Sequence, residues 1–313
     1  MSLKNIVFTW LVFKRGKRST LTFYDFQYHL EDNLRSLHED LNNGIYKHGG
    51  YRKFIVCDNK RREISVAYMR DRFVHRLVYD HLNKIYDKTF IYDAWSCRLG
   101  KGLLAAIERA QEFFKSYPQG FVWKGDVKKF FDSIDQETLL RILSMRIKDV
   151  QTFTLLKEII YSFSSYQGVG RGMPIGNLTS QIFANIYLNE LDRFVKHQLK
   201  PKAYLRYGDD FILLETDISK LQTFRIQTMD FLNQELKLQI NAKNDKLIKT
   251  KDGLRFLGVI LWPTGRTLNK RNFKRAHHRV KSNNVSSYSG MMKQHAKYKE
   301  VKYFNWLVQE KLL

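Results

Sequence analysis

Two adjacent aspartates separate two short apolar segments in the second half of the chain. Residues 203–205 (Ala-Tyr-Leu) precede residues 207–210 (Tyr-Gly-Asp-Asp), and residues 211–214 (Phe-Ile-Leu-Leu) follow them. Apolar runs around a tight polar turn predict a β-hairpin. Neighbouring carboxylates repel each other and lose solvation when they are packed, so they favour a cation between them. The pattern therefore predicts a site for a hard, oxygen-preferring cation such as Mg²⁺ at the hairpin tip.

A third carboxylate, Asp126, follows the short apolar strand expected at residues 121–123. A carboxylate where a buried strand ends can face the hairpin tip across a sheet. Three carboxylates can hold two metal ions about 3.5–4 Å apart, an arrangement that stabilises the attacking and leaving oxygens in phosphoryl transfer. Asp126, Asp209 and Asp210 are therefore the candidate metal ligands.

Composition points to a polyanionic partner. The 313 residues include 54 Lys and Arg against 31 Asp and Glu, a formal net charge of +23. Such a charge attracts nucleic acid first and an anionic membrane second. Basic residues thicken between 266 and 302, where eleven Lys or Arg accompany the single acid Glu300.

Several other classes of protein are not indicated. Cys57 and Cys97 form no Cys-x-x-Cys pair, so neither a zinc site nor a disulfide framework is expected, and a reducing cytoplasm fits. The apolar run at residues 6–13 is too short to span a bilayer, and we expect no membrane segment. The Gly-rich stretch at 168–172 has no Gly-Lys-Ser/Thr sequence after it, which argues against a P-loop.

Apolar residues at helical spacing predict helices that alternate with the short strands. These helices are expected at residues 26–41, 70–82, 103–114, 136–146, 180–195 and 224–236. Asp132 and Asp135 are expected to cap the N-terminus of the 136–146 helix, because acidic side chains accept bonds from free N–H groups there. Strands are also expected at 238–240 and 254–261.

In this order and spacing, the motifs resemble those of the reverse transcriptase family. The resemblance covers seven blocks: 63–82, 90–114, 121–135, 168–195, 203–214, 231–249 and 255–261. It implies an α+β fold, a right-hand polymerase with fingers, a palm on an antiparallel sheet and a small helical thumb. The implied division is an N-terminal helical segment at 1–44, fingers and palm at 45–265, and a basic helical thumb at 266–313. Residues 95–102 and 173–181 are similar to the bacterial branch that holds diversity-generating retroelements, near the defence-associated enzymes.

The resemblance also implies roles at the catalytic centre. Asp126, Asp209 and Asp210, helped by the carbonyl of Val127, would bind two Mg²⁺ ions. Lys243 would protonate the leaving pyrophosphate, and neighbouring Lys246 could fill that place instead.

Further roles concern the substrates. Phe131 would block a ribose 2′-OH, and Ile175 stands where retroviral enzymes carry a glutamine, so weaker discrimination against mismatches is expected. The residues implied in substrate binding are Arg98, Lys101, Phe131, Ile175, Gln181 and Gly258, with Arg98 and Lys101 on the triphosphate and Gly258 in the primer-gripping turn. The expected nucleic-acid contacts of the thumb are Lys270, Arg271, Lys274 and Arg275.

These observations predict an RNA-directed DNA polymerase that uses Mg²⁺ and dNTPs and copies a structured non-coding RNA into cDNA. The expected setting is a diversity-generating retroelement or an antiviral defence system, with an accessory protein or oligomer as an open possibility. One alternative is an RNA-directed RNA polymerase, because Gly208 matches the Gly-Asp-Asp of viral RNA polymerases. Another is a non-catalytic RNA-binding scaffold, against which the three clustered aspartates argue.

Overall fold

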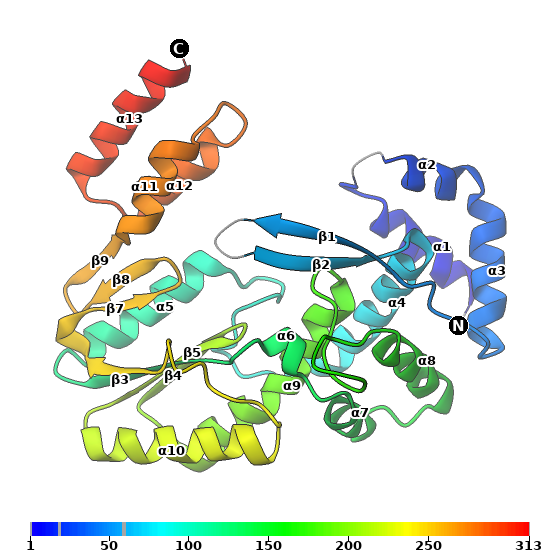
Figure 1. The fold of residues 1–313 in the computed structure, drawn as a ribbon, viewed down its shortest axis with the longest axis horizontal. Coiled ribbons are helices and arrows are strands. Elements are labelled where there is room, and N and C mark those ends of the chain that lie inside the picture. The colour runs from blue at the N-terminus through cyan, green and yellow to red at the C-terminus, as the bar shows by residue number, and fades with distance from the viewer. Residues whose placement is uncertain (1, 18–19, 58–60, 313) are drawn as a thin grey trace.

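The computed structural model describes residues 2–17, 20–57 and 61–312, and Figure 1 shows how its parts are arranged. From the N-terminus, the first part comprises α1 (Leu3–Phe13), α2 (Leu21–Tyr28), α3 (Leu30–Asn42), β1 (Tyr51–Cys57), β2 (Arg61–Ala67) and α4 (Met69–Tyr86). The central part comprises α5 (Leu103–Ser116), β3 (Phe121–Asp126), α6 (Phe130–Ser133), α7 (Gln136–Ser144), α8 (Val150–Tyr161), α9 (Leu178–Arg193), β4 (Ala203–Tyr207), β5 (Asp210–Glu215) and α10 (Ile218–Gln234). The last part comprises β6 (Lys246–Lys249), β7 (Leu254–Phe256), β8 (Val259–Trp262), β9 (Gly265–Leu268), α11 (Lys270–Arg279), α12 (Val285–His295) and α13 (Tyr298–Leu312).

The palm is a four-stranded antiparallel sheet with strand order β4-β5-β3-β6. Side chains alternate across it, as the two-residue period of a strand requires. Trp123 and Phe211 pack into the core that contains α9 and α10, whereas Val122 and Ile212 pack toward α5 and β8. Both faces are covered, with α10 below the sheet and α5 above it in Figure 1. The predicted hairpin and palm sheet are confirmed.

The fingers and the N-terminal helices share the large core with one face of the palm. Strands β1 and β2 form an antiparallel hairpin that projects toward the side of the thumb helices (Figure 1). The apolar run at 6–13 lies in α1, whose buried side is formed by Ile6, Trp10 and Phe13. The ring centroid of Trp10 lies 5.1 Å from that of Phe26 and 5.6 Å from that of Phe73. Among the described residues, no helix combines the length and the apolarity needed to cross a membrane.

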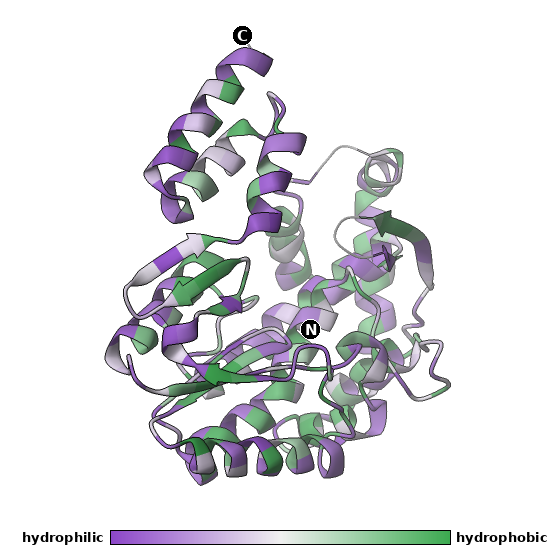
Figure 2. Cartoon of the chain, turned by 60° about the vertical axis from the view of Figure 1, so that its left-hand side comes forward, coloured by the Kyte–Doolittle hydropathy of each residue, from purple (hydrophilic) through white to green (hydrophobic). Residues whose placement is uncertain are grey.

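The thumb helices α11, α12 and α13 have a small core of their own, built on Ala276, Met292 and Phe304. They follow a three-stranded sheet, β7-β8-β9, which packs on α5. Residues 266–268 pair with β8 in this sheet. Figure 2 shows the palm strands as largely hydrophobic and much of the thumb as hydrophilic.

Local details differ from the sequence expectations at four places. The strand expected at 238–240 is absent from the described structure, where Ile240 forms only an isolated bridge with Val127. The expected strand at 254–261 is two strands, β7 and β8, joined by a turn at Leu257 and Gly258, which both have positive φ. Asp135 caps α7 by accepting the Thr138 N–H at 2.9 Å, as expected. Asp132 lies one turn earlier in the short helix α6. The helix expected at 26–41 is broken at His29, where α2 ends and α3 begins.

Candidate active site

The register of the palm sheet brings the three aspartates to one end. Asp126, the last residue of β3, is paired directly with Asp210, the first residue of β5. The Val127 N–H donates to the Asp209 carbonyl at 3.2 Å, so the chain after β3 is tied to the hairpin turn. Asp126 lies 83 residues before Asp209 in the sequence, and Asp209 is adjacent to Asp210. The register of the sheet thus brings all three carboxylates into one site.

Like charges and burial perturb this site. Burial, followed by repulsion from Asp210 and Asp126, raises the pKa of Asp209 to about 6. Arg62, on β2 of the fingers hairpin, acts in the opposite direction and lowers the same pKa. A divalent cation would relieve this repulsion, because it supplies the positive charge that the carboxylates lack.

Two carboxylates are held by neighbours that the sequence did not suggest. One oxygen of Asp126 accepts hydrogen bonds from the side-chain amides of Asn241 at 2.9 Å and Asn244 at 2.5 Å. Asp210 forms an ion pair of 3.1 Å with Lys124. These partners lie across the sheet or in the loop before β6, and only the tertiary fold reveals them.

The donor set fits a hard divalent cation, because carboxylate oxygens are the ligands that such ions prefer. Within the described ranges, no group of three or more His, Cys, Asp or Glu side chains is already arranged to hold a metal. The contacts of Asp126 and Asp210 explain this, since each carboxylate is turned toward an amide or an ammonium group. Binding a metal would replace these contacts.

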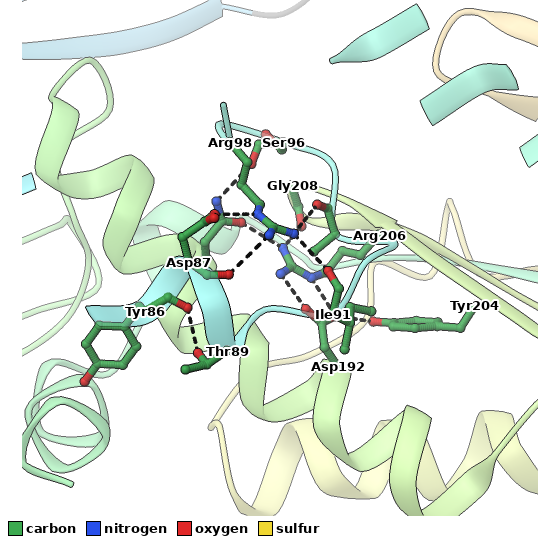
Figure 3. Close-up of polar contacts among 12 residues, drawn as sticks. Tyr86, Asp87, Thr89, Ile91, Ser96, Arg98, Asp192, Tyr204, Arg206 and Gly208 are labelled. Carbon is green, nitrogen blue, oxygen red and sulfur yellow. Dashed lines mark hydrogen bonds and ion pairs between the residues drawn. The ribbon is translucent and has the colours of Figure 1, made fainter. Parts of the chain in front are cut away.

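A buried arginine fixes the hairpin turn from beneath, as Figure 3 shows. Arg206 on β4 donates to Asp192 on α9 through two nitrogens, at 2.8 and 2.6 Å, and both side chains are almost completely buried. Its remaining nitrogen donates to the Gly208 carbonyl at 3.0 Å and to the side chain of Asn185. Gly208 has a φ of +65°, a conformation that glycine adopts without steric cost. Arg206 thereby holds the turn that carries Asp209.

The residues that were predicted to contact the incoming nucleotide lie near the fingers, in the loop after β3 and at the start of α9. Phe131 is half-buried, and its ring centroid lies 5.3 Å from that of Phe130. The Ile175 carbonyl accepts the Ser65 N–H of β2 at 3.0 Å, which ties this loop to the fingers. Gln181 is exposed in the first turn of α9.

Arg98 and Lys101 make contacts within their own loop (Figure 3 for Arg98). Arg98 donates to the Asp87 side chain and to the carbonyls of Asp87, Ile91 and Ala94, at 2.8 to 3.2 Å. Lys101 donates to the Tyr92 carbonyl and lies over the rings of Tyr92 and Trp95. The contact of Arg98 and Lys101 with a triphosphate stays a prediction.

Arg62, a cation on the fingers strand β2 that acts on Asp209, was missed by the sequence reasoning. The three consecutive basic residues at 60–62 of the sequence could have signalled it.

The remaining predicted residues lie at the margins of the palm. Lys243 is exposed in the turn between Asn241 and Asn244, and Lys246 is exposed on the edge strand β6. The Gly258 carbonyl accepts the side-chain amide of Asn272 at 3.1 Å, so the expected primer-gripping turn contacts α11. On that helix, Lys270, Arg271 and Lys274 are exposed and Arg275 is half-buried.

Comparison with known proteins decides the family. The family model for reverse transcriptase (RNA-dependent DNA polymerase) matches residues 45–261. The chain belongs to the reverse transcriptase family. It is thus an RNA-directed DNA polymerase, of a family that generally uses divalent metal ions.

Individual relatives support this assignment. Protein YkfC of Escherichia coli (strain K12) is 24% identical over 266 residues, which cover 72% of this chain and 70% of YkfC. Group II intron-encoded protein LtrA of Lactococcus lactis subsp. cremoris is 28% identical over 183 residues, 55% of this chain and 29% of LtrA. Telomerase from Candida albicans, solved with a fragment of telomeric RNA, is similar in fold with a TM-score of 0.54 and 12% identity, over 90% of this chain and 58% of that chain. The reverse transcriptase therefore spans less than a third of LtrA and little more than half of the telomerase chain.

Proposed function

We propose that the chain makes cDNA on an RNA template by two-metal nucleotidyl transfer at Asp126, Asp209 and Asp210. The observation that carries this proposal is the pairing of Asp126 with Asp210 beside the half-buried Asp209, whose pKa is raised. In the reaction, the primer 3′-hydroxyl gives its proton to solvent and its oxygen forms a bond to the α-phosphorus of a dNTP. The bond from that phosphorus to the bridging oxygen breaks, and pyrophosphate is released. Bound divalent metals would neutralise charge on the reacting phosphate.

The protein's own side chains contribute orientation and charge. Asp126, Asp209 and Asp210 would hold the metals, with the Val127 carbonyl as a further oxygen ligand. Arg62 adds positive potential from the fingers, and Lys243 is an exposed candidate donor of the proton that the leaving pyrophosphate takes up.

Three residues would set substrate specificity. The Phe131 ring would exclude a ribose 2′-OH, which favours dNTPs over NTPs. Ile175 offers no side-chain hydrogen bond to the incoming nucleotide, and Gln181 would contact the substrates from α9. The turn at Gly258 would support the primer next to α11.

Primer extension on an RNA template tests this proposal. Asp209→Asn and Asp210→Asn should each lower the rate by at least about 10²–10³, the usual effect of losing one preorganised electrostatic contact. Asp230→Asn, on the exposed side of α10, is the matched control and should extend normally. Near-normal extension by a folded Asp209 or Asp210 variant would contradict the two-metal assignment.

We propose a diversity-generating retroelement or an antiviral defence system as the setting, on the basis of residues 95–102 and 173–181. A second candidate is a role with a group II intron, because LtrA bears that description. Sequencing the RNA and DNA that co-purify with the protein separates them. Template-repeat RNA supports diversification, a structured RNA with repetitive cDNA supports defence, and intron RNA supports the second candidate.

A further inference from the structure

A basic pocket lies directly beyond the catalytic end of the palm sheet. It has a volume of about 580 Å³ and is lined by Lys128, Lys129, Arg171 and Lys237, with Tyr166 and Gln239 among the other lining residues. No acidic side chain lines it among the described residues. Its volume falls within the range typical of sites for small ligands, about 300–1,000 Å³.

The backbone places this pocket next to the metal-binding carboxylates. Asn241 N–H donates to the Asp126 carbonyl and Lys128 N–H donates to the Gln239 carbonyl, each at 2.8 Å. Val127 bridges Ile240 between these two bonds in antiparallel fashion. Lys128 lies in the turn after this bridge, two residues beyond Asp126. The pocket therefore adjoins the catalytic end of β3.

Two of the lysines occupy backbone positions where glycine would be less strained. Lys129 has a φ of +47° and Lys237 a φ of +50°. Lys237 follows the C-terminus of α10, at the position where a helix most often has glycine. Left-handed backbone is unfavourable for a side chain with a Cβ atom, so two such lysines facing one pocket indicate that their charges are used there.

Part of this positive charge is not neutralised within the protein. Lys237 lies 3.4 Å from Asp135, and Lys129 lies over the Tyr166 ring at 4.8 Å. Within the described part of the chain, the side chains of Lys128 and Arg171 have no hydrogen bond or ion pair. Lys129 also interacts electrostatically with Asp132. Two of the four cations, Lys128 and Arg171, are therefore without a carboxylate partner among the described residues.

We propose that this pocket binds an oligophosphate, namely the pyrophosphate released by nucleotidyl transfer, on its way out of the active site. Four cations in one pocket match a chain of linked phosphates, whereas a single strand of RNA brings only one charge per nucleotide. The identity of the ligand as a reaction product rests on the proposed function. Binding of an oligophosphate to the pocket does not.

The first measurement is equilibrium binding of inorganic pyrophosphate and tripolyphosphate to the full chain, with a chelator and without primer or template. Arg171→Gln and Lys237→Gln should each weaken binding about tenfold, and Lys196→Gln, on the exposed surface after α9, should leave it unchanged. Lys237→Gly should weaken binding equally while the melting temperature stays the same or rises, because glycine suits that φ. Binding is measured well below each melting temperature. Unchanged affinity in the Arg171 and Lys237 variants would overturn the proposal.

The second measurement is pyrophosphate inhibition of primer extension. The same variants should raise the inhibitory concentration about tenfold and change the KM for dNTP less than twofold. An equal rise in KM would overturn the proposal, because the residues would then serve the incoming nucleotide. The proposal would also be overturned if the Arg171 and Lys237 variants lost affinity for a single-stranded RNA but kept their affinity for pyrophosphate. If wild-type protein binds pyrophosphate but does not extend a primer, the proposed function fails and the phosphate pocket stands.

Discussion

Arg206 shows how one buried side chain connects the fold to the catalytic turn. Its guanidinium is 1% exposed and lies between Asp192, which neutralises it, and the carbonyl of Gly208. The Tyr204 hydroxyl donates to the same aspartate at 2.7 Å. Removing one member of a buried ion pair leaves an uncompensated charge, which is far more costly than losing a surface pair.

Arg206→Met should lower the free energy of unfolding by about 3–5 kcal/mol. Asp192→Asn added to it should recover much of this loss, because the amide is uncharged and still accepts from Tyr204. Primer extension should stay about tenfold reduced in the double variant, since the Gly208 carbonyl has lost its donor. Chemical denaturation and extension rates measure both effects.

The matched control is Arg225→Met, since Arg225 pairs with Asp245 at a site where its side chain is 32% exposed. Arg225→Met should lower the free energy of unfolding by no more than about 1 kcal/mol. Recovery of full extension in the Arg206 and Asp192 double variant would show that the turn does not need this support.

Phe131 gives the residue-scale test of substrate choice. Phe131→Ala should increase incorporation of NTPs relative to dNTPs more than tenfold, because an excluded 2′-OH must cost at least about 1.4 kcal/mol to matter. Single-nucleotide extension with dNTP and NTP pairs measures the ratio. Phe130→Ala is the control: that ring is 3% exposed, so its loss should destabilise the fold without altering sugar choice. A folded Phe131 variant with unchanged selectivity would favour the RNA polymerase alternative.

At the scale of elements, two histidines connect the segment before β1 to helix α4. His48 accepts the Gly50 N–H on Nδ1, and its Nε2 lies 3.2 Å from Nε2 of His75 on α4. One of these nitrogens must therefore be unprotonated. Burial, together with repulsion from His48 and Arg72, lowers the pKa of His75 to about 3.

This pair predicts acid sensitivity. The pKa of His75 in the folded protein lies below its value of about 6.5 in the unfolded chain. Neutral His75 therefore carries no penalty to the free energy of unfolding above pH 6.5. Stability is then lost as the pH falls from 6.5 toward 3, by about 2 kcal/mol between pH 6.5 and 5. Denaturation across this range should show a weaker pH dependence for His75→Gln, whereas His197→Gln, at an exposed position, should behave as wild type. An unchanged dependence in His75→Gln would mean that other groups control it.

Elements with strong local patterns were predictable from the sequence. The strands of the palm and the cap at Asp135 follow from apolar runs and acidic residues at their ends. The contacts of Asp126 with Asn241 and Asn244 were not predictable, because they join residues 115 and 118 positions apart. Arg98 illustrates the same limit, since a sequence motif does not reveal that the guanidinium donates to carbonyls of its own loop.

At the scale of the whole molecule, positive charge and the thumb determine how nucleic acid is held. A net charge of +23 attracts RNA and DNA alike, and neutralising phosphates releases counterions. Helix α11 begins next to the turn at Gly258, so a duplex gripped there would run along its basic side. Arg275 is half-buried, which leaves Lys270, Arg271 and Lys274 as the exposed positions to test.

Affinity for a single-stranded RNA should fall steeply with salt, with a slope of log K against log salt of about −0.7 per phosphate contact. Replacing Lys270, Arg271 and Lys274 by glutamate should make the slope shallower by about 2, because three contacts are lost. The control variant replaces Lys84, Lys115 and Lys196, which are exposed and lie outside the thumb, by glutamate, so its net charge changes by the same amount. If both triple variants flatten the slope equally, attraction by the whole molecule accounts for binding and α11 makes no direct contact. A shallower slope in the thumb variant alone identifies α11 as part of the nucleic-acid path.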